Sequence, residues 1–528
     1  MDRKRLRYGI GIQSFADLRT DGYVYVDKTE YVYALTHGDG KAYFLSRPRR
    51  FGKSLLLSTL EAYFRGRKDL FEGLEIMALE KEWLQYPVVH INLSTVQEGI
   101  EGALEEKLNN ELRGYETVYG LNPEPSASLS SRFENLIVAA SAREGRSVVI
   151  LIDEYDKPLL NTVDDPAAQI RQKNLLKSFY GVLKSRDAHI RFAMLTGVAR
   201  FGKVSVFSDL NNLKDISLDD AFNAVCGISE SELRSVFGAS IEGLAATLDI
   251  SPAETAARLR LQYDGYHFGN PARCEGIYNP FSLLNAFSSG YVEDYWFRTG
   301  TPTFLVKRLI NEDFHVPALS DIEKSRESIL DSDLLDRDPV NTLLQAGYLT
   351  IKSYDSETGM YRLGIPNREV EKGLDSQILK VYSSQTRTGF DVDRFRRAVD
   401  EGRVNTFMQN LAAFFADFPY DQVRQLELHY QNVLYTLFKL LGFYTRTEYR
   451  TSRGRIDAVV QTRRFVYIFE FKLDKSAQAA AARIQDKDYA APFAADDRQV
   501  YRIGVNFSST LRGIAEWTCT PAPVDDGI

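Results

Sequence analysis

The sequence predicts an α/β protein of several domains, with a parallel sheet in its first part and a smaller α/β domain near its end. Short apolar runs alternate with stretches of helical spacing over residues 1–222, which is typical of a parallel sheet covered by helices. Strand-like and helix-like segments follow one another again from Gln425 onwards. The 528 residues are enough for about three or four domains.

The strands expected in residues 1–222 are short and apolar. They are Tyr43–Leu45, Val88–Leu93, Val148–Ile152 and Arg191–Leu195. Helical spacing between them predicts helices over Lys53–Phe64, Leu104–Arg113 and Ala167–Ser185. Because helices separate the strands, the strands can lie parallel in one sheet.

A helical lid is expected over residues 223–300. Ser229–Glu232 and Ser251–Glu254 resemble helix starts, and Pro252 stands at a first helical position. The segment Tyr263–Pro280 is rich in aromatic residues, Gly and Asn, and it predicts a loop.

The remaining chain is expected to contain a middle region, a connector and a terminal domain. In residues 301–382, the segment Leu343–Ile351 followed by Tyr361–Leu363 predicts a helix end and a two-stranded wing around the turn Ser356–Gly359. This pattern favours a winged-helix-like region. Residues 383–424 form a helical connector, with its helix over Asp391–Phe418. The terminal domain, residues 425–517, comprises a helix to Leu441, further strands, a helix over Ser476–Tyr489 and the strand Val500–Val505, before a loose tail at residues 518–528.

Apolar composition and cysteine spacing indicate whether the chain is folded and in which cellular compartment it is expected. Hydrophobic residues make up 44% and charged residues 26%, so sizeable cores are expected and global disorder is excluded. The apolar runs fall short of the roughly 18 residues that a spanning helix needs, and no secretory signal follows Met1–Ile10, so we expect no membrane partner. Cys226, Cys274 and Cys519 lie far apart, which fits a cytoplasmic protein without a disulfide framework.

The formal charge of −7 is unevenly distributed. Residues 425–517 contain 14 Lys and Arg and 10 Asp and Glu, a net charge of +4, which leaves −11 for the rest. The average alone argues against a dedicated nucleic-acid coat. The terminal domain is nevertheless the better candidate for a polyanion.

A phosphate-binding loop is predicted at Arg47–Ser54. The sequence Arg-Pro-Arg-Arg-Phe-Gly-Lys-Ser follows a strand and opens a helix, which is the P-loop arrangement. The residues expected to bind the nucleotide here are Arg50, Phe51, Gly52, Lys53, Ser54 and Leu55: backbone N–H groups hold phosphates, Lys53 reaches the outer phosphates, and the Ser54 hydroxyl is a ligand of Mg²⁺. Arg47 replaces the usual first Gly, so its side chain must point away from the loop. A basic strand-to-helix turn is the alternative interpretation.

An acidic strand end supports the nucleotide site. Val148–Ile152 is followed by Asp153 and Glu154. In a P-loop enzyme Asp153 holds Mg²⁺ and Glu154 polarises the attacking water. Thr196, at the end of the next strand, is placed to sense the γ-phosphate, although a plain strand-terminal Thr is nearly as common. Arg200 and Lys203 are candidates for an arginine-finger-like cation at the nucleotide site. The alternative, which we favour, is that both are ordinary surface charges.

A second site is predicted in the terminal domain. In the strand that contains Phe469–Lys472, period-2 alternation puts Glu470 and Lys472 on one face. Asp457 on the neighbouring strand completes an Asp…Glu-x-Lys set, in which the carboxylates hold Mg²⁺ and Lys472 activates water and stabilises phosphate charge. The alternative interpretation is a strand whose end simply reaches the protein surface, because such a strand can have the same sequence.

Neighbouring residues strengthen this nuclease-type prediction. Glu427, on the preceding helix, is a further candidate metal ligand. Gln485 and Tyr489 are four residues apart on the expected helix and share a face there, suited to a nucleic-acid backbone. Basic residues come just before Asp457: Arg446, Arg450, Arg453 and Arg455.

These motifs together resemble a bacterial family that joins an AAA-ATPase-like P-loop domain to a C-terminal PD-(D/E)XK nuclease-like domain. The phrases that carry the resemblance are Tyr25–Thr29, Arg47–Ser54, Asp153–Asp156, Asn211–Asp215, Tyr263–Tyr266, Tyr295–Phe297, Arg453–Asp457 and Phe469–Lys472. The resemblance implies that Arg47 is the family's own form of the loop. It also implies ATP at Lys53, Ser54, Asp153 and Glu154, and a nuclease centre at Asp457, Glu470 and Lys472 with Glu427 and Gln485.

The fold class expected is therefore a P-loop NTPase parallel sheet with a helical lid, a winged-helix-like middle region and a C-terminal restriction-endonuclease-like α/β domain. The function expected is an ATP-binding and ATP-hydrolysing protein that controls a Mg²⁺-dependent nuclease acting on DNA or RNA. The partners expected are ATP, DNA or RNA at the C-terminal domain, and a second copy of the chain in a homo-oligomer. The alternative is a signalling or assembly ATPase whose nuclease-like domain only binds. A reader of carbohydrate or peptide at Tyr263–Phe268 is a third, weaker interpretation.

Overall fold

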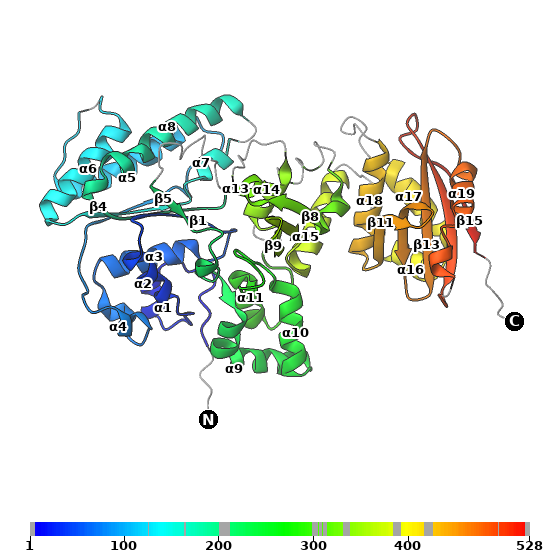
Figure 1. The fold of residues 1–528 in the computed structure, drawn as a ribbon, viewed down its shortest axis with the longest axis horizontal. Coiled ribbons are helices and arrows are strands. Elements are labelled where there is room, and N and C mark those ends of the chain that lie inside the picture. The colour runs from blue at the N-terminus through cyan, green and yellow to red at the C-terminus, as the bar shows by residue number, and fades with distance from the viewer. Residues whose placement is uncertain are drawn as a thin grey trace. The chain divides into compact units, whose positions relative to one another are not determined.

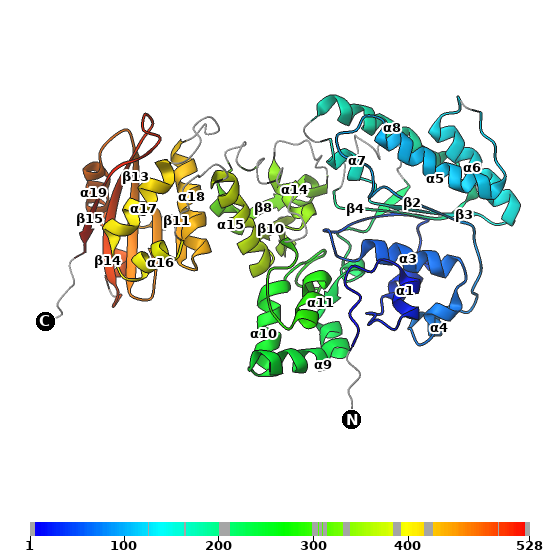
Figure 2. The ribbon, with the colours of Figure 1, turned by 180° about the vertical axis from the view of Figure 1, so that it is seen from behind.

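The computed structural model describes residues 6–124, 126–162, 165–199, 212–297, 314–330, 338–383, 392–416, 426–494 and 496–522, together with Leu305 and Leu309. The chain forms two compact units, each of which is described here by itself. Unit 1 comprises Met1–Thr299 and Asp321–Glu369, and unit 2 comprises Gly300–Ser320 and Val370–Ile528. Figures 1 and 2 show the two units from opposite sides.

The core of unit 1 is a five-stranded sheet in the order β2-β3-β4-β1-β5. Its strands are β1 (Ala42–Ser46), β2 (Val88–Asn92), β3 (Val148–Asp153), β4 (Ile190–Gly197) and β5 (Leu213–Asp215). All pairings are parallel. The predicted parallel sheet is thus confirmed, and β4 lies between β1 and the acidic strand β3.

Helices cover both faces of this sheet (Figures 1 and 2). On one face lie α5 (Ala103–Tyr119), α6 (Leu129–Glu144), α7 (Lys157–Leu160) and α8 (Pro166–Ser185). The other face carries α1 (Phe15–Thr20), α2 (Thr29–His37), α3 (Lys53–Phe64) and α4 (Ile76–Leu79). Buried Val, Ile and Leu side chains fill the space between the layers. Covering on both faces explains why the central strands are apolar throughout.

The helical lid contains α9 (Glu230–Leu248), α10 (Pro252–Tyr263) and α11 (Pro280–Ser289), with the small pair β6 (Ile228–Ser229) and β7 (Ile277–Tyr278). Ser229 and Ser251 both cap their helices, and Glu232 and Glu254 complete the two capping boxes. The predicted helix starts are therefore confirmed, because these side chains satisfy the free N–H groups of the first turns.

The middle region of unit 1 is a three-stranded antiparallel sheet with short helices. The strands are β8 (Ile322–Ser325), β9 (Thr350–Asp355) and β10 (Met360–Gly364), in the order β8-β10-β9. The helices α13 (Arg326–Leu330) and α14 (Pro339–Ala346) come before β9, whereas α15 (Arg368–Ser383), which follows β10, belongs to unit 2 from Val370 onwards. The predicted two-stranded wing is confirmed, since β9 and β10 pair around Ser356–Gly359.

Unit 2 is built on a five-stranded mixed sheet in chain order, β11-β12-β13-β14-β15. The strands are β11 (Tyr444–Thr451), β12 (Gly454–Gln461), β13 (Phe465–Leu473), β14 (Gln499–Ser508) and β15 (Gly513–Pro521). Only β13 and β14 run parallel among these pairs. Besides α15, the described α-helices of this unit are α16 (Val392–Asp400), α17 (Val404–Ala416), α18 (Leu426–Leu440) and α19 (Ala477–Asp486).

Two boundaries of unit 2 differ from the sequence expectation. The helices α16 and α17, expected in a connector, pack on this sheet: the Tyr467 hydroxyl donates to the Val399 carbonyl, and its ring contacts Phe407. Strand β15 continues beyond Trp517 to Pro521, so the first residues of the expected loose tail are strand, and residues 523–528 lie outside the described residues. No helix in the described residues is long and apolar enough to cross a bilayer.

Candidate functional site

The loop between β1 and α3 forms a cradle at a helix N-terminus. Gly52 has a left-handed φ of 99°, Arg50 has φ of 69°, and Lys53 begins α3. The first N–H groups of a helix have no intrahelical partner and attract anions. Lys53 is buried, and its Nζ donates to the carbonyls of Arg47 (2.9 Å) and Pro48 (3.1 Å). Burial lowers the pKa of Lys53, while Glu154 and Asp153 oppose that shift.

Arg47 points away from the cradle, as predicted. Its guanidinium is fully buried and donates to the carbonyls of Ser46, Ser217 and Phe222, each at 2.8 Å. The guanidinium also lies 4.0 Å from the ring centre of Phe268. Burial lowers the pKa of Arg47 to about 10. The residue that replaces the usual Gly therefore ties the P-loop to the segment after β5.

The acidic strand end faces this loop across β4. The Thr196 hydroxyl donates to Asp153 Oδ1 at 2.7 Å, and the Glu154 N–H donates to the same oxygen at 3.0 Å. Asp153 and Thr196 are both buried. Glu154 has a left-handed φ of 51°, and strain of this kind in a non-Gly residue is frequent at functional sites. Asp153, Glu154 and Thr196 therefore gather at one sheet edge.

Asp156 is a structural carboxylate that the sequence did not single out. Its Oδ2 accepts from the N–H groups of Val198 (2.8 Å) and Ala199 (2.6 Å) just beyond β4. Burial raises its pKa to about 6. The continuation of the chain holds Arg200 and Lys203, which lie outside the described residues.

An apolar pocket of about 100 Å³ adjoins the cradle. Gly52 and Leu55 line it from the loop side, and Cys226, Pro280 and Leu284 line it from the lid. A flat apolar group attached to a phosphate chain has a suitable wall here, because apolar pockets with few polar groups are typical ligand sites.

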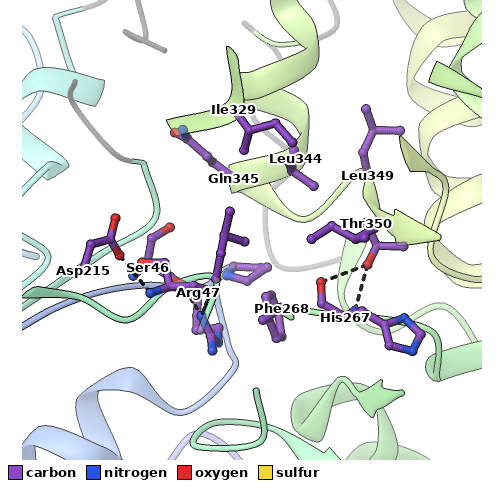
Figure 3. A pocket seen from close by; sticks show the side chains of 14 residues that line it. Ser46, Arg47, Asp215, His267, Phe268, Ile329, Leu344, Gln345, Leu349 and Thr350 are labelled. Atoms are coloured by element: carbon purple, nitrogen blue, oxygen red, sulfur yellow. Dashed lines mark hydrogen bonds between the residues drawn. The ribbon is translucent and has the colours of Figure 1, made fainter. Parts of the chain in front are cut away.

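A second cavity, of about 50 Å³, lies between the P-loop strand and the middle region (Figure 3). Arg47 and Phe268 line one side, and Ile329, Leu344 and Leu349 line the other. Two of the lining residues are hydrogen-bonded to each other, because the His267 N–H donates to Thr350 Oγ1 at 2.8 Å. The middle region of unit 1 thus packs directly against the phosphate loop.

The second site lies on β12 and β13 of unit 2. Asp457 and Glu470 are the chain neighbours of the terminal pair Ala458–Phe469, and Asp457 Oδ2 accepts from the Phe471 N–H at 2.7 Å. Lys472 Nζ donates to Glu470 Oε1 at 2.8 Å. The structure therefore brings together all three predicted centre residues. Burial raises the pKa of both carboxyl groups.

Arg483 of α19 is a fourth member that sequence reasoning missed. Its Nε lies 2.9 Å from Glu470 Oε1. The helical spacing of the sequence could have pointed to Arg483, because the buried face of α19 consists of Ala477, Ala480 and Ile484. Arg483 flanks that face, whereas Gln485 is exposed to solvent.

Glu448 on β11 is another residue that the sequence analysis passed over. The register places it opposite Asp457, between the pairs Thr447–Ala458 and Tyr449–Ile456. It has a left-handed φ of 53° and forms an ion pair with Arg455. Its charge adds to the rise in the pKa of Asp457.

The expectation that Gln485 and Tyr489 share a helix face was wrong. Helix α19 ends at Asp486, and Tyr489 lies beyond it with its ring buried in the core of the unit. Its hydroxyl lies close to Gly454. The basic residues expected to bind nucleic acid are partly engaged: Arg453 pairs with Asp488 at 3.0 Å, and Arg455 with Glu448. Both arginines remain largely exposed.

The residues present at the second site fit a divalent cation in donor chemistry. Asp457 and Glu470 offer carboxylate oxygens, which Mg²⁺ prefers, and the fully buried Glu470 Oε2 makes no hydrogen bond within the described part of the chain. Among the described residues no group of three or more His, Cys, Asp or Glu is arranged to hold a metal ion. The backbone of Glu427 lies in α18, and its side chain is outside the described set.

Comparison with known proteins agrees with this arrangement. A family described as predicted AAA-ATPase matches residues 9–207, and one described as PD-(D/E)XK nuclease superfamily matches residues 425–517. The fold and the two centres define an AAA-ATPase-like protein joined to a nuclease-superfamily domain.

A relative that matches over nearly its whole length identifies the family. The chain is 37% identical, over 97% of its own length and 98% of the relative, to an uncharacterised protein in the vnfD 5′ region of Azotobacter chroococcum mcd 1. The chain belongs to this family of fused ATPase-like and nuclease-like proteins.

Solved structures resemble the chain only distantly. The ORC2 protein of Aeropyrum pernix, solved as ADPNP–ADP complexes, is 12% identical to this chain, with a TM-score of 0.24. The aligned part covers 66% of this chain and 91% of the ORC2 chain. The ORC1 protein of Aeropyrum pernix in complex with DNA is 12% identical with a TM-score of 0.22, covering 66% and 90%. Similarity at this level says nothing about substrates or partners of this chain.

Proposed function

We propose that the chain is an ATP-binding and ATP-hydrolysing protein whose P-loop domain controls a Mg²⁺-dependent nuclease domain acting on DNA or RNA. The observation that carries the proposal is the set Asp457, Glu470 and Lys472 in one contact network, in a chain that also has a P-loop beside an acidic strand end. Each set suits phosphate chemistry, at a terminal phosphate in one case and at a phosphodiester in the other.

In the first site, Ser54 and Asp153 would hold the Mg²⁺ that accompanies the nucleotide, and the metal would neutralise phosphate charge. Lys53 would turn from the loop carbonyls to the outer phosphates, and Glu154 would orient the attacking water. Thr196 keeps the carboxylate of Asp153 in place through its 2.7 Å hydrogen bond. The apolar pocket beside Gly52 supports a place for the base.

In the second site, Asp457 and Glu470 would hold Mg²⁺, with Glu427 as a further ligand, and the metal would lower the pKa of a bound water. Lys472 is placed to stabilise the charge on the phosphate. Arg453 and Arg455 leave much of their side chains exposed, which suits contact with the nucleic-acid backbone. Solvent-exposed Gln485 stays in the proposed contact surface, whereas buried Tyr489 supports the core.

Two assays test the proposal. Steady-state ATP hydrolysis should be lost in Lys53→Ala and reduced at least about a hundredfold in Glu154→Gln. Cleavage of labelled single- and double-stranded DNA and RNA with Mg²⁺ or Mn²⁺ should be lost in Glu470→Gln. Residual cleavage that is equal in the wild type and Glu470→Gln would remove the catalytic assignment.

One observation favours a second function, in which the nuclease-like domain binds without cleaving: both cations near Glu470 already form ion pairs with it. Lys472 and Arg483 both occupy its Oε1, which also suits a nuclease-like domain that only binds nucleic acid or a partner. In that case the ATPase would be a switch for signalling or assembly. Tight nucleotide retention with a change in oligomeric state, and no cleavage with either metal, would favour this second function.

A further inference from the structure

Arg483 is positioned by the backbone of unit 2. In the parallel pairing of β13 with β14, Glu470 lies directly opposite Gly504. A Cβ at Gly504 would lie 2.4 Å from the Ala477 carbonyl oxygen and 2.6 Å from the Ala481 nitrogen. Helix α19 therefore rests on bare backbone beside Glu470, and the small residues of the helix allow that close approach. This contact fixes the distance of α19 from the sheet, and therefore the position from which Arg483 reaches the Glu470 carboxylate.

The charges around Glu470 balance within the protein. Asp457 and Glu470 are the two carboxylates of the centre, and Lys472 and Arg483 supply two cations. Both cations contact the same oxygen of Glu470. A buried carboxylate needs such compensation, since an isolated buried charge is costly.

Of the two cations, Arg483 is the one able to leave. Its side chain is 47% exposed, against 16% for Lys472 and 0% for Glu470. A divalent cation near Glu470 would supply the compensating charge and repel the guanidinium, so that Arg483, on the helix surface, could rotate into water. Once turned outward, the planar guanidinium is suited to a phosphodiester oxygen pair.

We propose that Arg483 is a displaceable counter-ion of Glu470: it neutralises the metal-free centre, weakens the binding of a divalent cation there, and is drawn away by the phosphate of a bound nucleic acid. This inference rests on the proposed nuclease centre. It makes Arg483 a positioning residue that links the cation to the substrate. By reciprocity, nucleic acid should tighten cation binding in the wild type.

The test is a titration of the full-length, nucleotide-free protein with MnCl₂ by isothermal calorimetry. The heat that disappears in Glu470→Gln identifies the site. Arg483→Gln is expected to bind Mn²⁺ about tenfold more tightly than the wild type, because a charge-assisted contact to Glu470 no longer competes. Arg483→Lys should stay near the wild-type affinity, since it restores the charge.

Arg463→Gln is the matched control. It removes one positive charge from the exposed turn between β12 and β13 of the same domain, and it should leave Mn²⁺ affinity unchanged. Thermal melting of each variant confirms that unit 2 is folded.

Three results are decisive. Tighter binding in Arg483→Gln alone supports the counter-ion role. Equal or weaker binding in a folded Arg483→Gln, beside a Glu470-dependent wild-type signal, overturns that role and leaves the nuclease proposal intact. Absence of any Glu470-dependent Mn²⁺ heat in both the wild type and Arg483→Gln overturns both proposals.

Discussion

Gly347 lies against Pro48 of the phosphate loop, so that a Cβ at residue 347 would be 2.6 Å from the proline ring. Gly347 ends α14 of the middle region and has φ of +87°. The neighbouring Arg49 carbonyl accepts from the indole N–H of Trp296 at 3.0 Å. Two consecutive residues of the loop are thus held by parts of unit 1 that follow the sheet.

Gly347→Ala is expected to weaken nucleotide binding and to destabilise unit 1 by about 2 kcal/mol or more, because left-handed strain adds to a clash with the loop. Titration with a fluorescent ATP analogue and chemical denaturation measure the two effects. Gly359→Ala is the control: Gly359 has φ of +70° with no atom near the added Cβ. If both variants lose the same stability and nucleotide affinity, the contact with Pro48 has no role of its own.

Arg47→Gly restores the usual first Gly of a P-loop but should destabilise unit 1 by about 3 kcal/mol. The loss leaves the buried carbonyls of Ser217 and Phe222 without their donor. Urea denaturation of the full chain measures the change. Arg49→Ala, which removes an exposed side chain and keeps the backbone contact, should cost less than about 0.5 kcal/mol. A stability of Arg47→Gly equal to that of the wild type would contradict the packing role.

Glu369 predicts a pH dependence of stability. The Trp296 N–H and the Ser282 hydroxyl donate to its carboxylate, and burial raises its pKa to about 7. A carboxyl with a raised folded-state pKa stabilises the fold fully below its unfolded pKa, and this contribution is lost as pH rises through about 7. Glu369→Gln should therefore remove about 2 to 3 kcal/mol of the decline in unfolding free energy between pH 4.5 and 7.5. Parallel curves for the wild type and the variant across this range would contradict the assignment.

Gly504→Ala should separate α19 from the sheet and destabilise unit 2 by about 2 kcal/mol, because the added methyl meets backbone atoms that cannot move independently. Hydrogen exchange of residues 477–486 should rise in the variant. Gly513→Ala serves as comparison, since the nearest atom to its added Cβ is 3.8 Å away. Unchanged exchange in Gly504→Ala would show that the helix does not depend on this contact.

The strongest sequence predictions were those with a local cause. The strand–loop–helix unit around Lys53 was predicted with the observed helix bounds, because Gly52 and the apolar spacing of α3 act within a few residues. The alternation in β13 likewise predicted that Glu470 and Lys472 share one face of the strand, where the structure shows them hydrogen-bonded. Such features need no knowledge of distant segments.

Features set by long-range packing were missed. Strand β5, Leu213–Asp215, is a three-residue edge strand that is not buried, so it has no apolar pattern to detect. Arg483 reaches Glu470 only because Gly504, far away in sequence, admits α19. The end of α19 at Asp486 carries neither Gly nor Pro, which is why the expected helix extended to Tyr489.

The ATP dependence of cleavage is the measurement that bears most closely on the proposed control of the nuclease domain by the P-loop domain. Cleavage of a labelled nucleic acid is followed with and without ATP in the wild type, Lys53→Ala and Glu470→Gln, with Mg²⁺ present throughout. We expect ATP to change the wild-type rate at least about threefold, no response in Lys53→Ala, and no cleavage in Glu470→Gln. A Glu470-dependent cleavage rate that is the same with and without ATP in the wild type would show that the P-loop domain does not control the nuclease domain.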